Sequence, residues 1–132
     1  MKRENIKIEI IDSIALITLS GTIHAETIIK TLGELFGNSD YVSGCSIWDF
    51  RKAEGESTFD EIRKIAKFAG EHRGKRPVGR VALIVSSELH FGLSRIYQVL
   101  TENLPFHLEI FKSFEQAREW VMSADTRSTP VL

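Results

Sequence analysis

The sequence predicts a single α/β domain built on a mixed five-stranded sheet. Short apolar or alternating runs, typical of strands, take turns with segments whose apolar residues recur every three to four positions. Only Asp12 and Ser13 separate the first two strand-like runs, which indicates a hairpin. With 132 residues, 42% hydrophobic and 27% charged, the chain suits one domain with a real core and not a disordered segment.

Five runs have the pattern of strands. Asn5–Ile11 alternates polar and apolar residues and is expected to be half-buried, whereas Ile14–Ser20 is apolar at nearly every position, as in a strand covered on both faces. Gly21 is expected to end this second strand. The other three are short apolar runs between loops: Cys45–Phe50, Val78–Ser86 and Phe106–Phe111.

Four segments have helical spacing. The first begins at Ala25 and stops at Gly37, and the second begins at Ser57 or Thr58 and breaks at Gly70. The third covers about Glu88–Asn103, and the last follows the cap Ser113. The inward faces of the last three are expected at Phe59, Ile62, Ala66 and Ala69, at Leu89, Leu93, Ile96 and Leu100, and at Phe114, Ala117, Trp120 and Val121.

The order β-β-α-β-α-β-α-β-α has a consequence for the faces of the sheet. If successive strands are neighbours, right-handed crossovers place the connecting helices mainly on one face. The other face is then open to the chain ends or a partner. Trp48 and Phe50 share one side of their strand, and we expect Trp48 on the open face, where it favours a homodimer. The alternative is that Lys7, Glu9, His107 and Glu109 line that face and cover the aromatics.

Several segments carry a family resemblance: LITLSGTIHAE, IWDFRKAEG, VALIVSSELHFGLSRIYQVL and FEQAREWV. The sequences of these segments and their order resemble those of proteins with the SpoIIAA-like fold, and more narrowly of the bacterial STAS/SEC14-like group of small single-domain proteins. The resemblance implies one STAS-like domain over residues 1–124, with residues 125–132 a frayed tail.

The resemblance also implies a function. It indicates a non-enzymatic binding or regulatory domain that acts through a regulatory protein partner or a small apolar or anionic ligand. One alternative is a SEC14-like carrier of a lipid or small apolar ligand, which needs a cavity of roughly 300 Å³ or more. The second alternative is an uncharacterised enzyme, for which no nucleophile and base, or metal, can be assembled from the sequence.

Candidate site residues follow from the same comparison. In STAS relatives a strand ends in an aspartate, matched by Asp49, and a serine at the next helix start is phosphorylated. Ser57 and Thr58 occupy that position here. The relatives have the motif Asp-Ser-Ser-Gly, whereas this sequence reads GESTFDEI. The two hydroxyls are either candidate phosphoacceptors or simple N-caps of the helix. The candidate residues for binding a ligand or partner are Trp48, Asp49, Arg51, Phe91, Gly92 and Arg95.

Gly92 and Phe91 are unusual on a helix. Glycine inside a helix costs about 1 kcal/mol relative to alanine, so either a close approach or a tight internal contact is expected there. An outward Phe91 suggests a partner or an overlying loop, and Arg95 is expected on the same outer side. The basic segment HRGKRPVGR is either a solvated loop or an anion site.

Composition excludes several classes. The net charge of −1, from 17 basic and 18 acidic residues, argues against general nucleic-acid binding. Cys45 is the single cysteine and is expected to be a small buried hydrophobe, and the four histidines are scattered, so we expect no metal and no cofactor. The sequence has no apolar run long enough for a membrane span and no signal-peptide pattern, so the expected location is cytoplasmic.

Overall fold

The computed structural model describes residues 3–123, so the expected tail lies outside the described residues. Strands and helices follow each other in the predicted order. The strands are β1 (Asn5–Ile11), β2 (Ile14–Thr22), β3 (Ser46–Glu54), β4 (Gly79–Ile84) and β5 (Phe106–Phe111). The helices are α1 (Ala25–Phe36), α2 (Phe59–His72), α3 (Glu88–Leu100) and α4 (Phe114–Met122).

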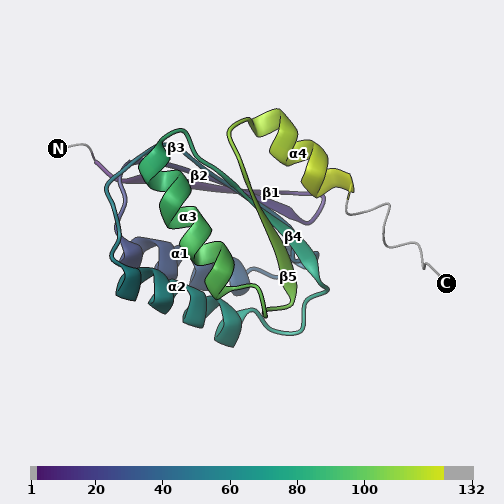
Figure 1. Cartoon of the computed structure of the whole chain (residues 1–132). Coiled ribbons are helices and arrows are strands. Elements are labelled where there is room, and N and C mark those ends of the chain that lie inside the picture. Colours follow the sequence, from purple (N-terminus) through teal and green to yellow (C-terminus); the bar gives the residue numbers. More distant parts are fainter. Residues whose placement is uncertain (1–2, 124–132) are drawn as a thin grey trace.

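The strands form one mixed sheet in the order β1-β2-β3-β4-β5. β1 is antiparallel to β2, and every later pair is parallel. Figure 1 shows α1, α2 and α3 together on one side of the sheet and α4 on the other. The predicted fold class is confirmed, because each crossover joins neighbouring strands and returns its helix to the same face.

The central strands are covered on both faces and therefore bury two separate clusters. The larger cluster lies between the sheet and α1, α2 and α3, and includes Ile17, Leu35, Trp48 and Leu83. The smaller cluster lies under α4 and includes Cys45, Ile47, Ala82, Ile84, Ala117 and Val121. Cys45 is thus a small buried hydrophobe, as predicted.

Trp48 does not lie on an open face, and this prediction was wrong. Its side chain is only 4% exposed and points toward α1, α2 and α3. The alternation along β3 is as expected, but the face assignment is reversed: Ile47 lies under α4 instead. Both sets of side chains on β3 include large apolar residues, so alternation alone does not identify which side the helices cover.

The orientation of α3 also differs from the prediction. Leu89 was expected inward but is 50% exposed, and Ser94 is the buried residue of this helix. His90, Leu93 and Tyr97 point inward with Ser94. Because apolar residues lie on more than one side of α3, their spacing does not define a single buried face.

Some element boundaries extend beyond the predicted ones. β2 continues through Gly21, and β3 continues to Glu54 because residues 52–54 pair with residues 20–22. α2 continues through Gly70 to His72. Phe59 is exposed, not inward, because it is the first helical residue after the cap, where the Arg63 guanidinium lies over its ring.

Tyr41 connects the loop after α1 to the larger cluster. Its side chain is 3% exposed, and the Arg76 guanidinium lies 4.9 Å from the centre of its ring. Burial raises the pKa of Tyr41 to about 12, although Ser46 and the positive charge of Arg73 act in the opposite direction. The folded protein therefore holds the phenol proton more tightly than an exposed tyrosine does.

We expect stability to fall at alkaline pH because of Tyr41. A pKa raised above its ordinary value of 10.0 contributes stability that is complete below pH 10 and is lost as pH rises through about 12. The expected loss at pH 12 is about 2 kcal/mol. Urea unfolding of the wild type and of Tyr41→Phe at pH 9, 10.5 and 11.5 measures it. Equal pH dependence in the two proteins would contradict the assignment.

Candidate functional site

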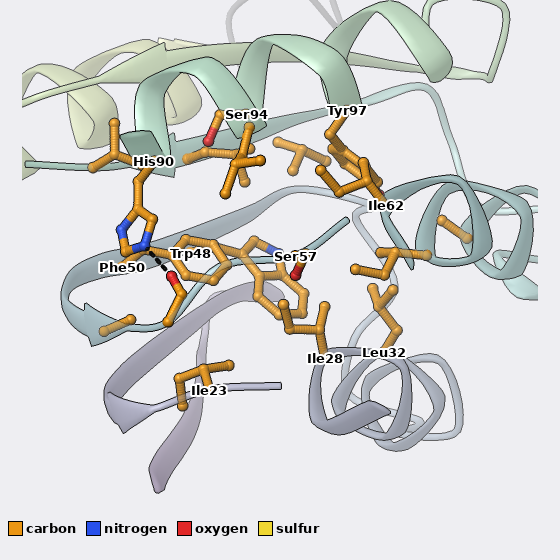
Figure 2. Close-up of a pocket in the computed structure, with 18 of the residues that line it drawn as sticks. Ile23, Ile28, Leu32, Trp48, Phe50, Ser57, Ile62, His90, Ser94 and Tyr97 are labelled. Atoms are coloured by element: carbon orange, nitrogen blue, oxygen red, sulfur yellow. Dashed lines mark hydrogen bonds between the residues drawn. The ribbon is translucent and has the colours of Figure 1, made fainter. Parts of the chain in front are cut away.

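An apolar cavity of about 140 Å³ lies between the sheet and the three helices on its larger covered face. Figure 2 shows Trp48 and Phe50 from β3 on one side and residues of α1, α2 and α3 around them. The two aromatic rings of β3 are stacked, with their centroids 6.3 Å apart. The helices contribute the following side chains to the lining of the cavity: Ile28, Leu32, Ile62, Ile65, Ala69, Leu93, Ser94 and Tyr97.

Small side chains from separate elements leave this space. Ala53 at the end of β3, Ala69 on α2 and Ser94 on α3 all line the cavity. Each occupies a position where a larger apolar residue would reach into the space between sheet and helix. The cavity therefore results from the combination of three small residues that lie far apart in the sequence.

The loop after β3 and the first turn of α3 meet at one end of the cavity. There the Nε2 atom of His90 lies 2.8 Å from the carbonyl oxygen of Gly55. Glu54 at the end of β3, with Glu56 and Ser57 from this loop, also lines the cavity here. This end lies at the carboxyl ends of the parallel strands, where ligands gather in open α/β sheets.

Arg73 lines the cavity as well, at the end of α2 and therefore near the amino ends of the strands. Its guanidinium donates to the carbonyl oxygens of Arg76 at 3.1 Å and Pro77 at 2.6 Å, and it lies over the ring of Phe106. Burial lowers the pKa of Arg73 from its ordinary value. Within residues 3–123, the hydrogen bonds observed for this guanidinium go to these two carbonyl groups.

Arg76 belongs to the same segment and also binds carbonyl groups. Its guanidinium donates to Tyr41 at 2.8 Å, Phe36 at 2.9 Å and Arg73 at 2.6 Å. Arg76 thus holds the loop before β4 against the end of α1, whereas Arg73 binds carbonyl groups within that loop. Arg73 is buried and Arg76 is half-buried, and in the structure both donate to carbonyl groups of the protein itself.

Tyr97 places a phenol in the apolar part of the site. Burial alone raises the pKa of Tyr97 above its ordinary range, so this phenol stays neutral at physiological pH. The indole Nε1 of Trp48 donates to the Ser46 hydroxyl at 3.1 Å, so that polar atom is satisfied within the protein. The site is therefore apolar in its middle and polar at its ends.

Two of the residues predicted from the sequence line the cavity, namely Trp48 and Ser57. Thr58, next to Ser57, is the N-cap of α2. Its hydroxyl accepts from the backbone N–H of Glu61 at 3.1 Å, and the Glu61 carboxylate accepts from the backbone N–H of Thr58 at 2.8 Å. The predicted capping box is confirmed.

Asp49 and Arg51 lie apart from the cavity. They project from the opposite face of β3, since Trp48 and Phe50 occupy the helix-covered side. The Arg51 guanidinium donates to both carboxylate oxygens of Asp49, at 2.9 and 2.7 Å. Partial burial raises the pKa of Asp49, but the hydrogen bonds and charge of Arg51 outweigh it, so the net pKa is lowered.

The three candidates on α3 lie on its outer side. Phe91 is 42% exposed, as expected, and Arg95 is exposed. Neither a close approach nor a tight internal contact occurs at Gly92, because no atom lies within 4 Å of the position of a Cβ there. Arg95 donates to Gln98, whose amide donates to the Leu108 carbonyl of β5 at 2.7 Å.

His90, Arg73 and Tyr97 line the cavity but were not predicted as site residues from the sequence. A basic residue after a helix and a tyrosine within one are common in any α/β domain. The available signal was the i, i+3, i+4, i+7 spacing of His90, Leu93, Ser94 and Tyr97, which marks one side of a helix. This pattern was masked by the leucines on the neighbouring side.

Two further structural findings concern metals and membranes. Among residues 3–123 no group of three or more histidine, cysteine or acidic side chains is arranged to hold a metal ion. Within the same residues, no helix has the length and apolar character needed to cross a bilayer.

Known structures share the fold of this chain. A crystal structure of an uncharacterized protein of the DUF3478 family with a SpoIIAA-like fold, from Shewanella loihica PV-4, is 19% identical and has a TM-score of 0.57. The match covers 92% of this chain and 95% of that one. An anti-sigma factor antagonist from Mycobacterium paratuberculosis is 12% identical with a TM-score of 0.60, over 91% of this chain and 95% of that one.

These likenesses establish the fold of the chain. It is a SpoIIAA-like fold, as the resemblance of the sequence implied. No family model matches the sequence, and the search of curated proteins found no significant match.

Proposed function

We propose that this protein is a non-enzymatic, cytoplasmic binding domain that holds a small apolar ligand between its sheet and α1, α2 and α3. The observation that carries the proposal is the cavity lined by Trp48, Phe50 and Tyr97. Apolar walls with a few polar groups at the ends are typical of small-ligand sites. Occupation of this space by a ligand fixes the distance between α3 and the sheet, which gives a regulatory domain a simple readout.

The volume limits the size of the ligand. A cavity of about 140 Å³ is below the roughly 300 Å³ expected for a lipid carrier or a drug-sized ligand. It is close to the roughly 150 Å³ of an engineered apolar cavity that binds benzene. We therefore favour a ligand with one aromatic ring or a short alkyl chain over the larger lipid of a SEC14-like carrier.

The polar groups of the cavity support binding over catalysis. A serine nucleophile needs a neighbouring base to accept its proton. The imidazole that lines the cavity belongs to His90, and a carbonyl oxygen can only accept, so the contact with Gly55 requires a proton on Nε2. This nitrogen is therefore a donor that joins α3 to the loop after β3, and it does not act as a base toward Ser57 or Ser94.

Titration of the protein with benzene, indole and octanoate tests the proposal. We expect indole or benzene to bind and to shift the nuclear magnetic resonance of the Trp48 indole N–H. Replacing an inward residue by a larger one, Ser94→Leu, should fill the space and weaken binding at least tenfold. If none of the three compounds shifts the Trp48 signal, the proposed ligand class is wrong.

A neighbouring position on the same helix provides the matched control. Arg95→Leu adds a leucine on the outer side of α3, where it leaves the cavity unchanged. We expect this variant to bind like the wild type. Equal affinity in Ser94→Leu and the wild type, with both proteins folded by circular dichroism, would place the ligand outside the cavity.

A second candidate function is binding of a regulatory protein. Phe91 is 42% exposed on the outer side of α3, and an exposed aromatic side chain at this position supports a contact with a protein partner. The structural neighbour from Mycobacterium paratuberculosis is an anti-sigma factor antagonist, and this likeness of fold supports a protein partner for the chain. Phe91, Gly92 and Arg95 remain our proposed contacts for such a partner.

Phosphorylation of Ser57 or Thr58 is part of this second candidate. A phosphate there would benefit from the positive end of α2, but Glu56, Asp60 and Glu61 oppose it by their charge. We expect Thr58→Ala to lower the free energy of unfolding by about 1 kcal/mol through loss of the cap, and Ser57→Ala to change it by less than about 0.5 kcal/mol. Chemical denaturation measures both.

The same variants examine the modification itself. If a kinase of the host modifies the protein, the double variant Ser57→Ala with Thr58→Ala should take up no phosphate. Uptake that survives in this folded double variant would place the acceptor elsewhere.

A further inference from the structure

The outer edge of strand β1 carries an inference that does not depend on the proposed ligand. β1 lies at the edge of the sheet and pairs only with β2 among the described strands. An edge strand presents a row of backbone N–H and C=O groups to which another strand can add.

The hairpin determines which groups of β1 face outward. Its turn consists of two residues with positive φ, Asp12 at 53° and Ser13 at 68°, so Ile11 and Ile14 close it as a hydrogen-bonded pair. In an antiparallel ladder, bonded and non-bonded pairs alternate. The backbone groups of Ile6, Ile8 and Ile10 therefore point away from β2, toward the free edge.

The side chains of β1 alternate between the two faces of the sheet. Ile6, Ile8 and Ile10 pack partly against the larger hydrophobic cluster and keep some surface exposed. Lys7 and Glu9 lie on the other face, 3.8 Å apart, with their side chains 69% and 41% exposed. The outward backbone groups thus belong to three isoleucines that still have apolar area to bury.

One antiparallel pairing of β1 with a second copy of itself satisfies all of these groups. With the two-fold axis at Ile8, the middle of the strand, Ile6 lies opposite Ile10 of the second copy. Lys7 then lies opposite Glu9 of the second copy, twice in the dimer. If the pairing register is shifted by two residues, Lys7 lies opposite Lys7 of the second copy, or, for a shift in the other direction, Glu9 lies opposite Glu9 of the second copy. Both arrangements place like charges opposite one another and are repulsive.

We propose that β1 is a dimerisation strand that joins two copies of this protein edge to edge into one continuous sheet. The interface is isologous, as in most homodimers, because the same residues contribute from both chains. The opposite charges of Lys7 and Glu9 set its register, and the isoleucines supply its apolar contacts. This surface replaces the Trp48 face, which the helices cover.

Reversing the charges tests the register. Lys7→Glu and Glu9→Lys each place like charges opposite one another in a homodimer, and each should raise its dissociation constant about tenfold or more. An equimolar mixture of the two variants restores both opposite-charge pairs and should form a heterodimer. The double variant Lys7→Glu with Glu9→Lys should dimerise like the wild type. Sedimentation equilibrium and native mass spectrometry measure these states.

A charge reversal on the far edge is the control. Glu109→Lys on β5 lies on the other edge strand and should leave the dimer unchanged. Circular dichroism checks that each variant is folded. A wild-type protein that stays monomeric at about 500 μM, or a mixture of single variants that forms no heterodimer, overturns the proposal.

Discussion

Gly79→Ala is expected to prevent stable folding. A Cβ at this position would lie 2.3 Å from the carbonyl oxygen of Gly44 and 2.9 Å from the backbone nitrogen of Cys45. Both atoms belong to the backbone that leads into β3, the strand paired with β4. Relief of the clash would have to separate the two central strands, so we expect a loss of about 4 kcal/mol or more in the free energy of unfolding.

The same substitution at Gly92 is expected to have the opposite sign. This glycine lies inside α3 and no atom approaches its Cβ position within 4 Å, so alanine should stabilise the helix by about 1 kcal/mol. The melting temperature should rise by about 3 °C. Differential scanning calorimetry of the two variants compares them directly. If Gly79→Ala melted near the wild type, the close contact between the strands would be wrong.

Arg73→Met is expected to cost about 3 kcal/mol of stability. Methionine preserves much of the buried apolar volume but leaves the carbonyl oxygens of Arg76 and Pro77 without their donor. A buried acceptor that loses its donor costs about 1–3 kcal/mol, and these two contacts are partly buried. Arg73→Lys should fall between the wild type and Arg73→Met, because an ammonium keeps the charge but lacks the planar fork that reaches both carbonyls.

An exposed arginine provides the comparison for Arg73. Arg95→Met removes a guanidinium from the outer side of α3 and should change stability by less than about 0.5 kcal/mol. Guanidinium chloride denaturation of both variants yields the difference. Should the two variants prove equally stable, the buried guanidinium would have no structural role.

The sequence predicted the fold well because strand and helix patterns have different periods. The hairpin turn at Asp12 and Ser13 and the cap at Thr58 were also predictable, since each depends on a few adjacent residues. Interactions of this short range are encoded locally, and no distant part of the chain needs to be known.

The candidate site was less predictable because it depends on distant parts of the chain. The cavity exists because Ala53, Ala69 and Ser94 are small together, and no one of them is unusual alone. The side of β3 that carries Trp48 could not be assigned, because both sides of that strand carry large apolar residues. The residues around Arg73 in the sequence do not distinguish it from a solvated arginine, because its burial depends on the tertiary structure.

The position of α4 has a consequence for biosynthesis. This helix covers Ile47, Ala82 and Ile84 but is translated after every strand it shields. Ribosomes add about 5–20 residues per second, so α4 is made within about a second or two of β5. A chain truncated before Phe114 would lack this cover, and its aliphatic side chains on this face would be exposed, a kind of surface that chaperones bind.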